Sequence, residues 1–194
     1  LDEQGNSIMR IMAGSLCDTN IVLLKPEPAR TGMLFEIEYK ISNVTDYSVP
    51  IIDCSESHMG SFTGFKVYPD KVVLNSSSLK TEENQSFRFN TEDRIHLAIA
   101  IMPDIYGNTD FNVCVLYING VKNREFTYAS NDYFLVNNTL KIGSDNADID
   151  LYGIRLYSNA LSSDGVIKNW VDWRSDNEEK KKAQGHNNVY NAAG

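Results

Sequence analysis

The chain has 194 residues, of which 42% are hydrophobic and 23% charged, a composition ordinary for a globular domain large enough to bury a real core. The formal net charge is −8, whereas nucleic-acid and anionic-membrane partners call for a basic surface, so we expect neither nucleic acid nor membrane as a partner. No apolar run approaches the ~18 residues of a membrane-spanning helix.

The three cysteines, Cys17, Cys54 and Cys114, are far apart and show no CxxC spacing. This pattern excludes a thiolate zinc site and a dense disulfide framework, and it leaves open a bridge between two of the three. The N-terminal segment lacks the features of a signal peptide, and we expect it to be cut from a longer protein.

Short segments with a hydrophobic period of two recur along the chain and predict a β-sandwich or barrel. The clearest segment is Met33–Ile41, in which Phe35 and Ile37 face one way and Glu36 and Glu38 the other. The predicted strands are Ile8–Ala13, Ile21–Lys25, Met33–Ile41, Val49–Cys54, Gly64–Tyr68, Lys71–Leu74, Ser86–Phe89, Arg94–Met102, Asn112–Ile118, Val121–Tyr128, Thr139–Ile142 and Ile149–Tyr157.

Two of these strands carry further information. Asn119-Gly120 lies between two strand patterns and predicts a hairpin with a type I′ turn, because both residues accept positive φ at low cost. The segment Ile95–Met102 is apolar or small on both faces and predicts a central strand that is covered on both sides and ends at Pro103.

The period changes near the end of the chain. Val166, Ile167, Trp170 and Val171 share one helical face, and Ser163 to about Ala183 is predicted as the one substantial helix. Ser162 or Ser163 is expected to cap its start, and Trp170 is expected to pack between helix and sheet. We assign residues 1–175 to the domain and residues 176–194 to the helix end and a linker tail.

Several motifs in the second half of the chain occur in a known order. Ile142–Gly143, Ile154–Tyr157 and Ala160–Ser162 resemble the closing strand of laminin-G-like, concanavalin A-like jelly rolls, and Tyr117–Gly120 resembles their hairpin. The resemblance implies an all-β, two-sheet antiparallel jelly-roll sandwich with one C-terminal helix packed against an edge or rim. It also implies a range of roles, namely glycan binding, protein binding, calcium-dependent adhesion or a structural role.

The stretch from Asn169 to Tyr190 resembles the exit of such domains in large structural proteins of gut-bacterial phages. That likeness implies a place on a virion or outside a cell, with neighbouring domains of the same parent chain as partners.

Some relatives of this fold are glycosidases, so paired carboxylates come first among candidate catalytic groups. Glu36 and Glu38 form an i, i+2 pair, but the third position of the relatives' acidic triplet is Lys40 here, which would neutralise the site. Asp148 and Asp150 form a second such pair. We interpret both pairs as solvated strand faces and predict no catalytic residue.

Sugar binding needs an exposed aromatic ring with polar groups beside it. Three loops offer this combination, Asn43–Ser48, Asp104–Asp110 and Asn131–Asn137, and a fourth around His58 offers a ligand contact. The predicted ligand-binding residues are Tyr47, His58, Tyr106, Asn108, Asn131, Asp132 and Tyr133.

Calcium is the one metal that the residues suggest, since it takes carboxylate, amide and backbone oxygens. Two Asp- and Asn-rich loops supply them, with Asp104 and Asp110 in one and Asp145 and Asp148 in the other. Asp and Asn are also ordinary turn residues.

The sequence is compatible with three functions. The first is a non-catalytic recognition module that binds glycan or protein on a cell surface. The second is a structural or assembly module of a phage or surface protein, and the third is a glycan-cleaving enzyme.

Overall fold

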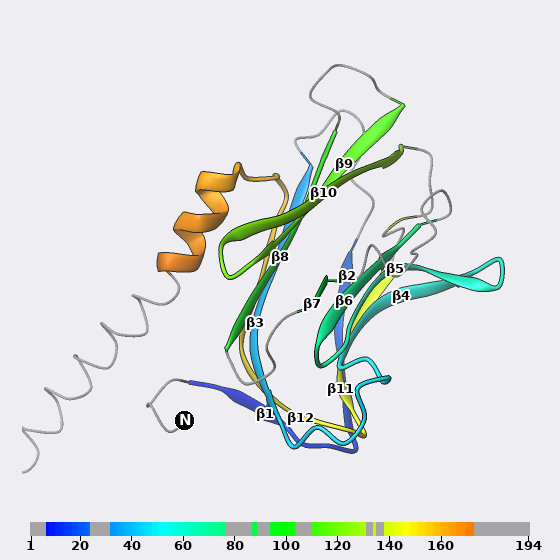
Figure 1. Cartoon of the computed structure of the whole chain (residues 1–194), viewed down its shortest axis with the longest axis vertical. Coiled ribbons are helices and arrows are strands. Elements are labelled where there is room, and N and C mark those ends of the chain that lie inside the picture. Colours follow the sequence, from blue (N-terminus) through cyan, green and yellow to red (C-terminus); the bar gives the residue numbers. More distant parts are fainter. Residues whose placement is uncertain are drawn as a thin grey trace, which may run out of the picture.

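Two antiparallel sheets lie face to face in the computed structural model of the chain (Figure 1). The structure describes residues 7–23, 32–76, 87–88, 94–103, 110–130, 134 and 138–172. The predicted fold class, a two-sheet antiparallel jelly-roll sandwich with one helix, is confirmed. Among the described residues, no helix is both long and apolar enough to cross a bilayer.

Each sheet has six strands, and every pair of neighbours is antiparallel. The first sheet, called sheet A, consists in spatial order of β1 (Met9–Ile11), β12 (Asp148–Tyr157), β3 (Met33–Ser42), β8 (Ile95–Pro103), β9 (Phe111–Ile118) and β10 (Val121–Ala129). The second, sheet B, consists of β2 (Ser15–Leu23), β11 (Asn138–Ser144), β4 (Ile52–His58), β5 (Ser61–Val67), β6 (Lys71–Asn75) and β7 (Phe87–Arg88).

All twelve predicted strands are present, with different ends. The largest difference is at β2, which begins at Ser15, whereas the predicted strand begins at Ile21. The prediction left out residues 15–20 because their side chains are mostly polar and show no clear hydrophobic alternation. The strands β4 and β5 also extend further than predicted and form a hairpin through Met59 and Gly60.

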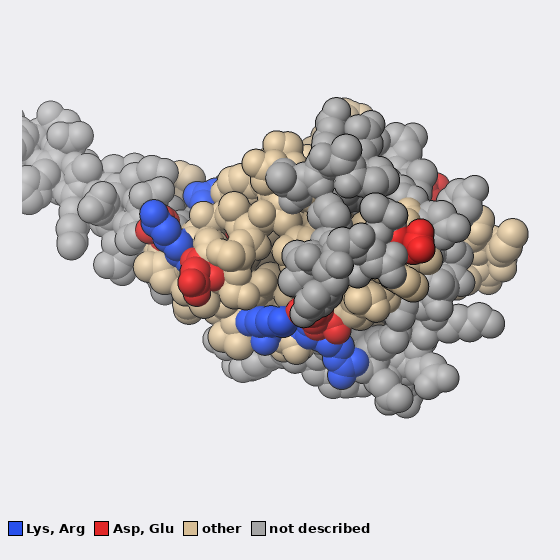
Figure 2. All heavy atoms as spheres, turned by 90° about the horizontal axis from the view of Figure 1, so that it is seen from above, with Lys and Arg blue, Asp and Glu red and all other residues tan. Residues whose placement is uncertain are grey.

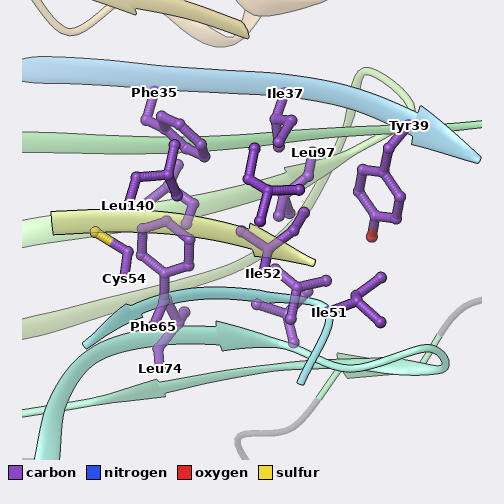
Figure 3. Close-up of a cluster of buried hydrophobic side chains, with 14 of the residues drawn as sticks. Phe35, Ile37, Tyr39, Ile51, Ile52, Cys54, Phe65, Leu74, Leu97 and Leu140 are labelled. Carbon is purple, nitrogen blue, oxygen red and sulfur yellow. The ribbon is translucent and has the colours of Figure 1, made fainter. Parts of the chain in front are cut away.

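The main core fills the space between the two sheets. Figure 3 shows Phe35, Ile37 and Tyr39 of β3 pointing from sheet A toward Ile52 and Phe65 of sheet B. The rings of Phe35 and Phe65 meet with their centroids 5.4 Å apart, so the two sheets are joined by a direct aromatic contact. The three cysteines are free thiols, and two of them lie in this core.

A second, smaller apolar cluster lies on the opposite, outward face of sheet A. The helix of residues 163–172 covers it, with Val166 fully buried there (Figure 1). The prediction that the helix packs at an edge or rim is therefore wrong. Three central strands present small and apolar side chains outward, and these need cover from water: Leu34, Ala98, Ala100, Val113, Val115 and Tyr117.

The start of the helix and the packing of Trp170 against the sheet follow the sequence prediction, and the predicted residues 173–183 lie outside the described part of the chain. The Ser162 hydroxyl accepts a hydrogen bond from the amide of Gly165, and its carbonyl accepts one from Val166, so Ser162 is the cap. The Trp170 ring lies against Gly120 in the β9–β10 turn. Asn119 and Gly120 have φ values of 51° and 75°, which confirms the predicted type I′ hairpin.

Gly120→Ala is expected to destabilise the domain more than Gly14→Ala. Both glycines have positive φ, but a Cβ at Gly120 would lie 2.6 Å from the Trp170 ring, whereas one at Gly14 meets nothing within 4 Å. Gly14→Ala therefore measures backbone strain alone, about 1–2 kcal/mol. The clash should add about 1–3 kcal/mol in Gly120→Ala, measured by urea unfolding. Equal losses in the two variants would contradict the packing of Trp170.

Candidate functional site

Three turns meet at one end of the sandwich, at the bottom of Figure 1. We call this surface the three-loop end and define it as residues 12–15, 43–48 and 144–148. The amide of Thr45 donates to the carbonyl of Asn146 over 2.8 Å, and the amide of Gly14 donates to the carbonyl of Ser144 over 3.0 Å. Two loops that the sequence presents as separate candidates are therefore one surface.

The carboxylate of Asp148 holds these loops together. One of its oxygens accepts a hydrogen bond from the amide of Ala13 and the other from the side-chain amide of Asn43, each over 2.7 Å. These two donors lower the pKa of Asp148, and its side chain is mostly buried. The interpretation of Asp148 as a solvated residue is wrong, since it is 8% exposed. Asp150 is bound by the guanidinium of Arg10 over 2.6 and 2.8 Å.

The same end presents an aromatic ring beside polar groups. The side chain of Tyr47 is 49% exposed. Next to it, Asp46 accepts hydrogen bonds from the amide and the hydroxyl of Ser48, both over 2.7 Å, which lower its pKa and fix the turn. Asp145 is also exposed. A hydrogen-bonded loop with a half-exposed ring and exposed carboxylates is the kind of surface that binds polyhydroxylated ligands.

The described residues that flank the predicted loops Asp104–Asp110 and Asn131–Asn137 lie at the other end of the sandwich. The amide of Ser130 donates to the carbonyl of Asp110 over 2.8 Å, next to the end of sheet A where β3 begins. The three-loop end adjoins the place where β3 finishes, at the pairing of Ser42 with Asp148. The predicted residues that lie outside the described part of the chain are Asp104, Tyr106, Asn108, Asn131, Asp132 and Tyr133.

The end opposite the three-loop end is the one seen from above in Figure 2. Over the part of this face that the structure describes, acidic and basic side chains lie side by side among uncharged ones. Such mixing gives the described surface neither a basic nor an acidic patch at this end.

His58 does not lie in a loop, contrary to the prediction. It is the last residue of β4, paired with Ser61 across a tight turn whose Met59 has a φ of 47° and is 92% exposed. The polar run around His58 resembles a loop in sequence, but its residues pair as a protruding hairpin, because a two-residue turn is enough to reverse the chain.

A second polar cluster, which the sequence analysis missed, lies under the helix. Glu36 is fully buried on the outward face of β3, and the side-chain amide nitrogen of Asn169 lies 3.3 Å from both of its oxygens. The same nitrogen is 3.2 Å from the hydroxyl oxygen of Tyr157. Burial raises the pKa of Glu36, and the contacts with Asn169, Arg155 and Tyr157 oppose that rise.

Glu38, two residues along β3, is also fully buried and is paired with Arg94. Two guanidinium nitrogens lie 2.7 and 2.8 Å from its two oxygens, and the guanidinium stacks over the ring of Tyr152 at 3.7 Å. His96 is also fully buried, with Nε2 3.7 Å from a carboxylate oxygen of Glu36. The pair Glu36 and Glu38 is therefore not a solvated face, and Arg94 rather than the exposed Lys40 compensates its charge.

The burial of this pair had a signal in the sequence. Glu36 pairs with Ala98, which in turn pairs with Tyr117, so one outward row carries an acid between small and apolar neighbours. A face of that composition requires a covering element, and the apolar side of the predicted helix was available to cover it.

Among the described residues, no three His, Cys, Asp or Glu side chains are grouped closely enough to hold a metal ion. Calcium stays a prediction, since it also takes backbone and amide oxygens. The surface that could supply them is the turn from Ser144 to Asp148, where Asp145 is exposed and Asp148 already accepts two hydrogen bonds.

The fold has counterparts among solved structures. The chain is similar to the receptor-binding domain of botulinum neurotoxin D, with 16% identity and a TM-score of 0.54 over 84% of this chain and 43% of that chain. It is also similar to the receptor-binding domain of botulinum neurotoxin type G, with 12% identity and a TM-score of 0.50 over 86% of this chain and 46% of that chain. At this identity the likeness establishes a shared fold.

The chain spans less than half the length of these domains. No family model matches its sequence. No curated protein matches it either.

Asp148→Asn is expected to lower stability by about 1–2 kcal/mol, because one of the two hydrogen bonds to a charged acceptor is lost or reversed. The lowered pKa means that the wild-type carboxylate stabilises the fold above its ordinary pKa of 3.8 and loses that effect as the pH falls through the lowered value. Urea unfolding at pH 7 and pH 3 should therefore show a gap between wild type and variant that shrinks in acid. Asp46→Asn is the control. Asp46 is hydrogen-bonded only within its own turn in the described contacts, so this variant should lower the free energy of unfolding less than Asp148→Asn does.

Removal of calcium is expected to lower the melting temperature if the turn from Ser144 to Asp148 binds the ion, since a ligand bound only to the native state stabilises it. Differential scanning calorimetry with added calcium and with excess chelator gives the comparison. Asp145→Asn should then abolish the difference. An identical melting temperature with calcium and with chelator would show that the native domain does not bind the ion.

Proposed function

We propose that this chain is a recognition module that binds a glycan on a cell surface through the three-loop end, without catalysing a reaction. The observation that carries the proposal is the convergence of three turns around Asp148, which places the exposed Tyr47 and Asp46 at the same end of the sandwich as the exposed Asp145. The ring offers an apolar face to a sugar ring, and the carboxylates and backbone groups offer partners for hydroxyl groups.

The solved structures of similar fold support a binding role, because their names describe receptor-binding domains. A module of this kind works outside a cell or on a virion, as a part of a larger protein. We propose that setting for this chain, with neighbouring domains of the same parent chain and a surface glycan or protein as its partners.

The glycan-cleaving alternative needs two carboxyl groups that a substrate can reach. Glu36 and Glu38 are both fully buried, with Asn169 and Arg94 on their oxygens. Glu36 is buried under the helix and Glu38 is buried with Arg94, and these positions favour a role in folding and support a module that binds rather than cleaves.

The assembly alternative has one observation in its favour. Leu16 and Val22 point outward from β2, an edge strand of sheet B, and are 67% and 38% exposed. Apolar side chains on a sheet edge suit contact with a neighbouring protein. A trimer in light scattering, together with no hit on a glycan array at millimolar sensitivity, would favour assembly over glycan binding.

Tyr47→Ala is expected to weaken binding of the best array glycan about 5- to 30-fold, because loss of a stacked ring removes on the order of 1–2 kcal/mol. Isothermal titration calorimetry measures the change, and circular dichroism checks that the variant is folded. Phe111→Ala is the matched comparison, since Phe111 is 42% exposed at the opposite end of the sandwich. Loss of binding in Phe111→Ala alone would move the site to that end.

A further inference from the structure

The helix of residues 163–172 is attached to sheet A by two kinds of contact. One is apolar: Val166 is fully buried on the outward face of the sheet, and the Trp170 ring lies on Gly120. The other is polar: the Tyr117 hydroxyl lies 3.0 Å from that of Ser163, and the two oxygens of an ionisable group, Glu36, face the side chain of Asn169. The apolar contact does not depend on pH between 4 and 8, whereas the polar one depends on the state of the carboxyl.

Glu36 has no access to water while the helix is in place. Its side chain is fully buried, and the described partners on its oxygens include a neutral amide at 3.3 Å, which is a long hydrogen bond for a carboxylate. Burial deprives the ionised carboxyl of its favourable hydration free energy, and movement of the helix away from the sheet would restore it. A neutral carboxyl loses much less hydration free energy on burial, and it still accepts a hydrogen bond from the Asn169 side chain.

Other groups face Glu36 from each neighbouring element. Arg155 and Tyr157 on β12 favour a negative charge on Glu36. His96 lies beside it on β8, the carboxylate of Glu38 on β3 is paired with Arg94, and the Tyr117 hydroxyl on β9 lies 3.0 Å from that of Ser163. The nearest nitrogen of His96 is 3.7 Å away, beyond hydrogen-bonding distance, and the arginine bound at 2.7 Å belongs to Glu38. Burial therefore outweighs compensation at Glu36.

We propose that protonation of Glu36 controls how tightly the helix binds sheet A, with the neutral carboxyl giving the tighter contact. Burial raises the pKa of Glu36 above its ordinary value of 4.5. The stabilisation is full below 4.5 and is lost as the pH rises through the raised value. The helix binds most tightly in mild acid and opens more often near neutral pH, and each opening exposes the apolar cluster beneath it.

Hydrogen–deuterium exchange of the full chain measures this opening directly, because amide protection reports the equilibrium between closed and open states. The measured exchange rates are first corrected for the intrinsic exchange rate of each amide at each pH. The protection factors of residues 163–172 should then fall by up to about tenfold per pH unit above 4.5, until the pH passes the raised pKa of Glu36. Protection of β9 should stay constant. The chain's two tryptophans are Trp170 and Trp173, so acrylamide quenching gives an independent reading of the same region.

Three variants distinguish this mechanism from others. Glu36→Gln keeps the shape of the side chain and should give helix protection that does not vary with pH. Asn169→Asp places a second carboxyl against the first and should make the pH dependence steeper. Asp53→Asn, which removes a partly exposed acid of sheet B paired with Lys66, should leave the wild-type profile unchanged.

Two results would overturn the proposal. One is helix protection in the wild type that does not change between pH 4.5 and 8, which requires no variant to fold. The other is an unchanged pH dependence in Glu36→Gln, which would assign the effect to another group such as His96. Neither result bears on glycan binding at the three-loop end, because the two sites share no residue.

Discussion

The burial of β3 on both faces is the constraint on which the rest of this structure depends. Its inward side chains form the contact between the sheets, where the rings of Phe35 and Phe65 meet. Its outward side chains include two acids, and a buried carboxylate requires partners. Asn169 and Arg94 provide them. The helix is therefore part of the fold, since without it the acids and the apolar cluster beside them would face water on one side of a central strand.

The two polar clusters of the molecule have opposite physical characters. At the three-loop end, hydrogen bonds lower the pKa of Asp148 and of Asp46, and the surface around Tyr47 is open. Under the helix, burial raises the pKa of Glu36 and no surface remains. An open surface with fixed charges suits binding, whereas a closed acidic cluster suits control of a packing contact. This difference is the reason why we propose recognition at the three-loop end and pH dependence at the helix.

Much of the fold could be predicted because its signals are local. The alternation in Met33–Ile41 and the Asn119-Gly120 turn each depend on residues near in sequence, and each is confirmed. The predicted apolar face of the helix is confirmed only in part, since Val166 is buried but Ile167 and Val171 are exposed. The site was predicted in pieces: Tyr47 and Asp148 were both candidates, in separate loops. Their juxtaposition depends on contacts such as that between Thr45 and Asn146, 101 residues apart, which no period or motif encodes.

The sequence by itself determined the strands, the turn between β9 and β10, the start of the helix and the residues that fill the space between the sheets. Tertiary structure decided which residues pair with Glu36 and Glu38, that the carboxylate of Asp148 joins the loops of the three-loop end, and where the helix lies. The reason is the same in each case. Alternation along a strand separates its two faces, but whether the second face meets water depends on an element as far away as Asn169, 133 residues from Glu36.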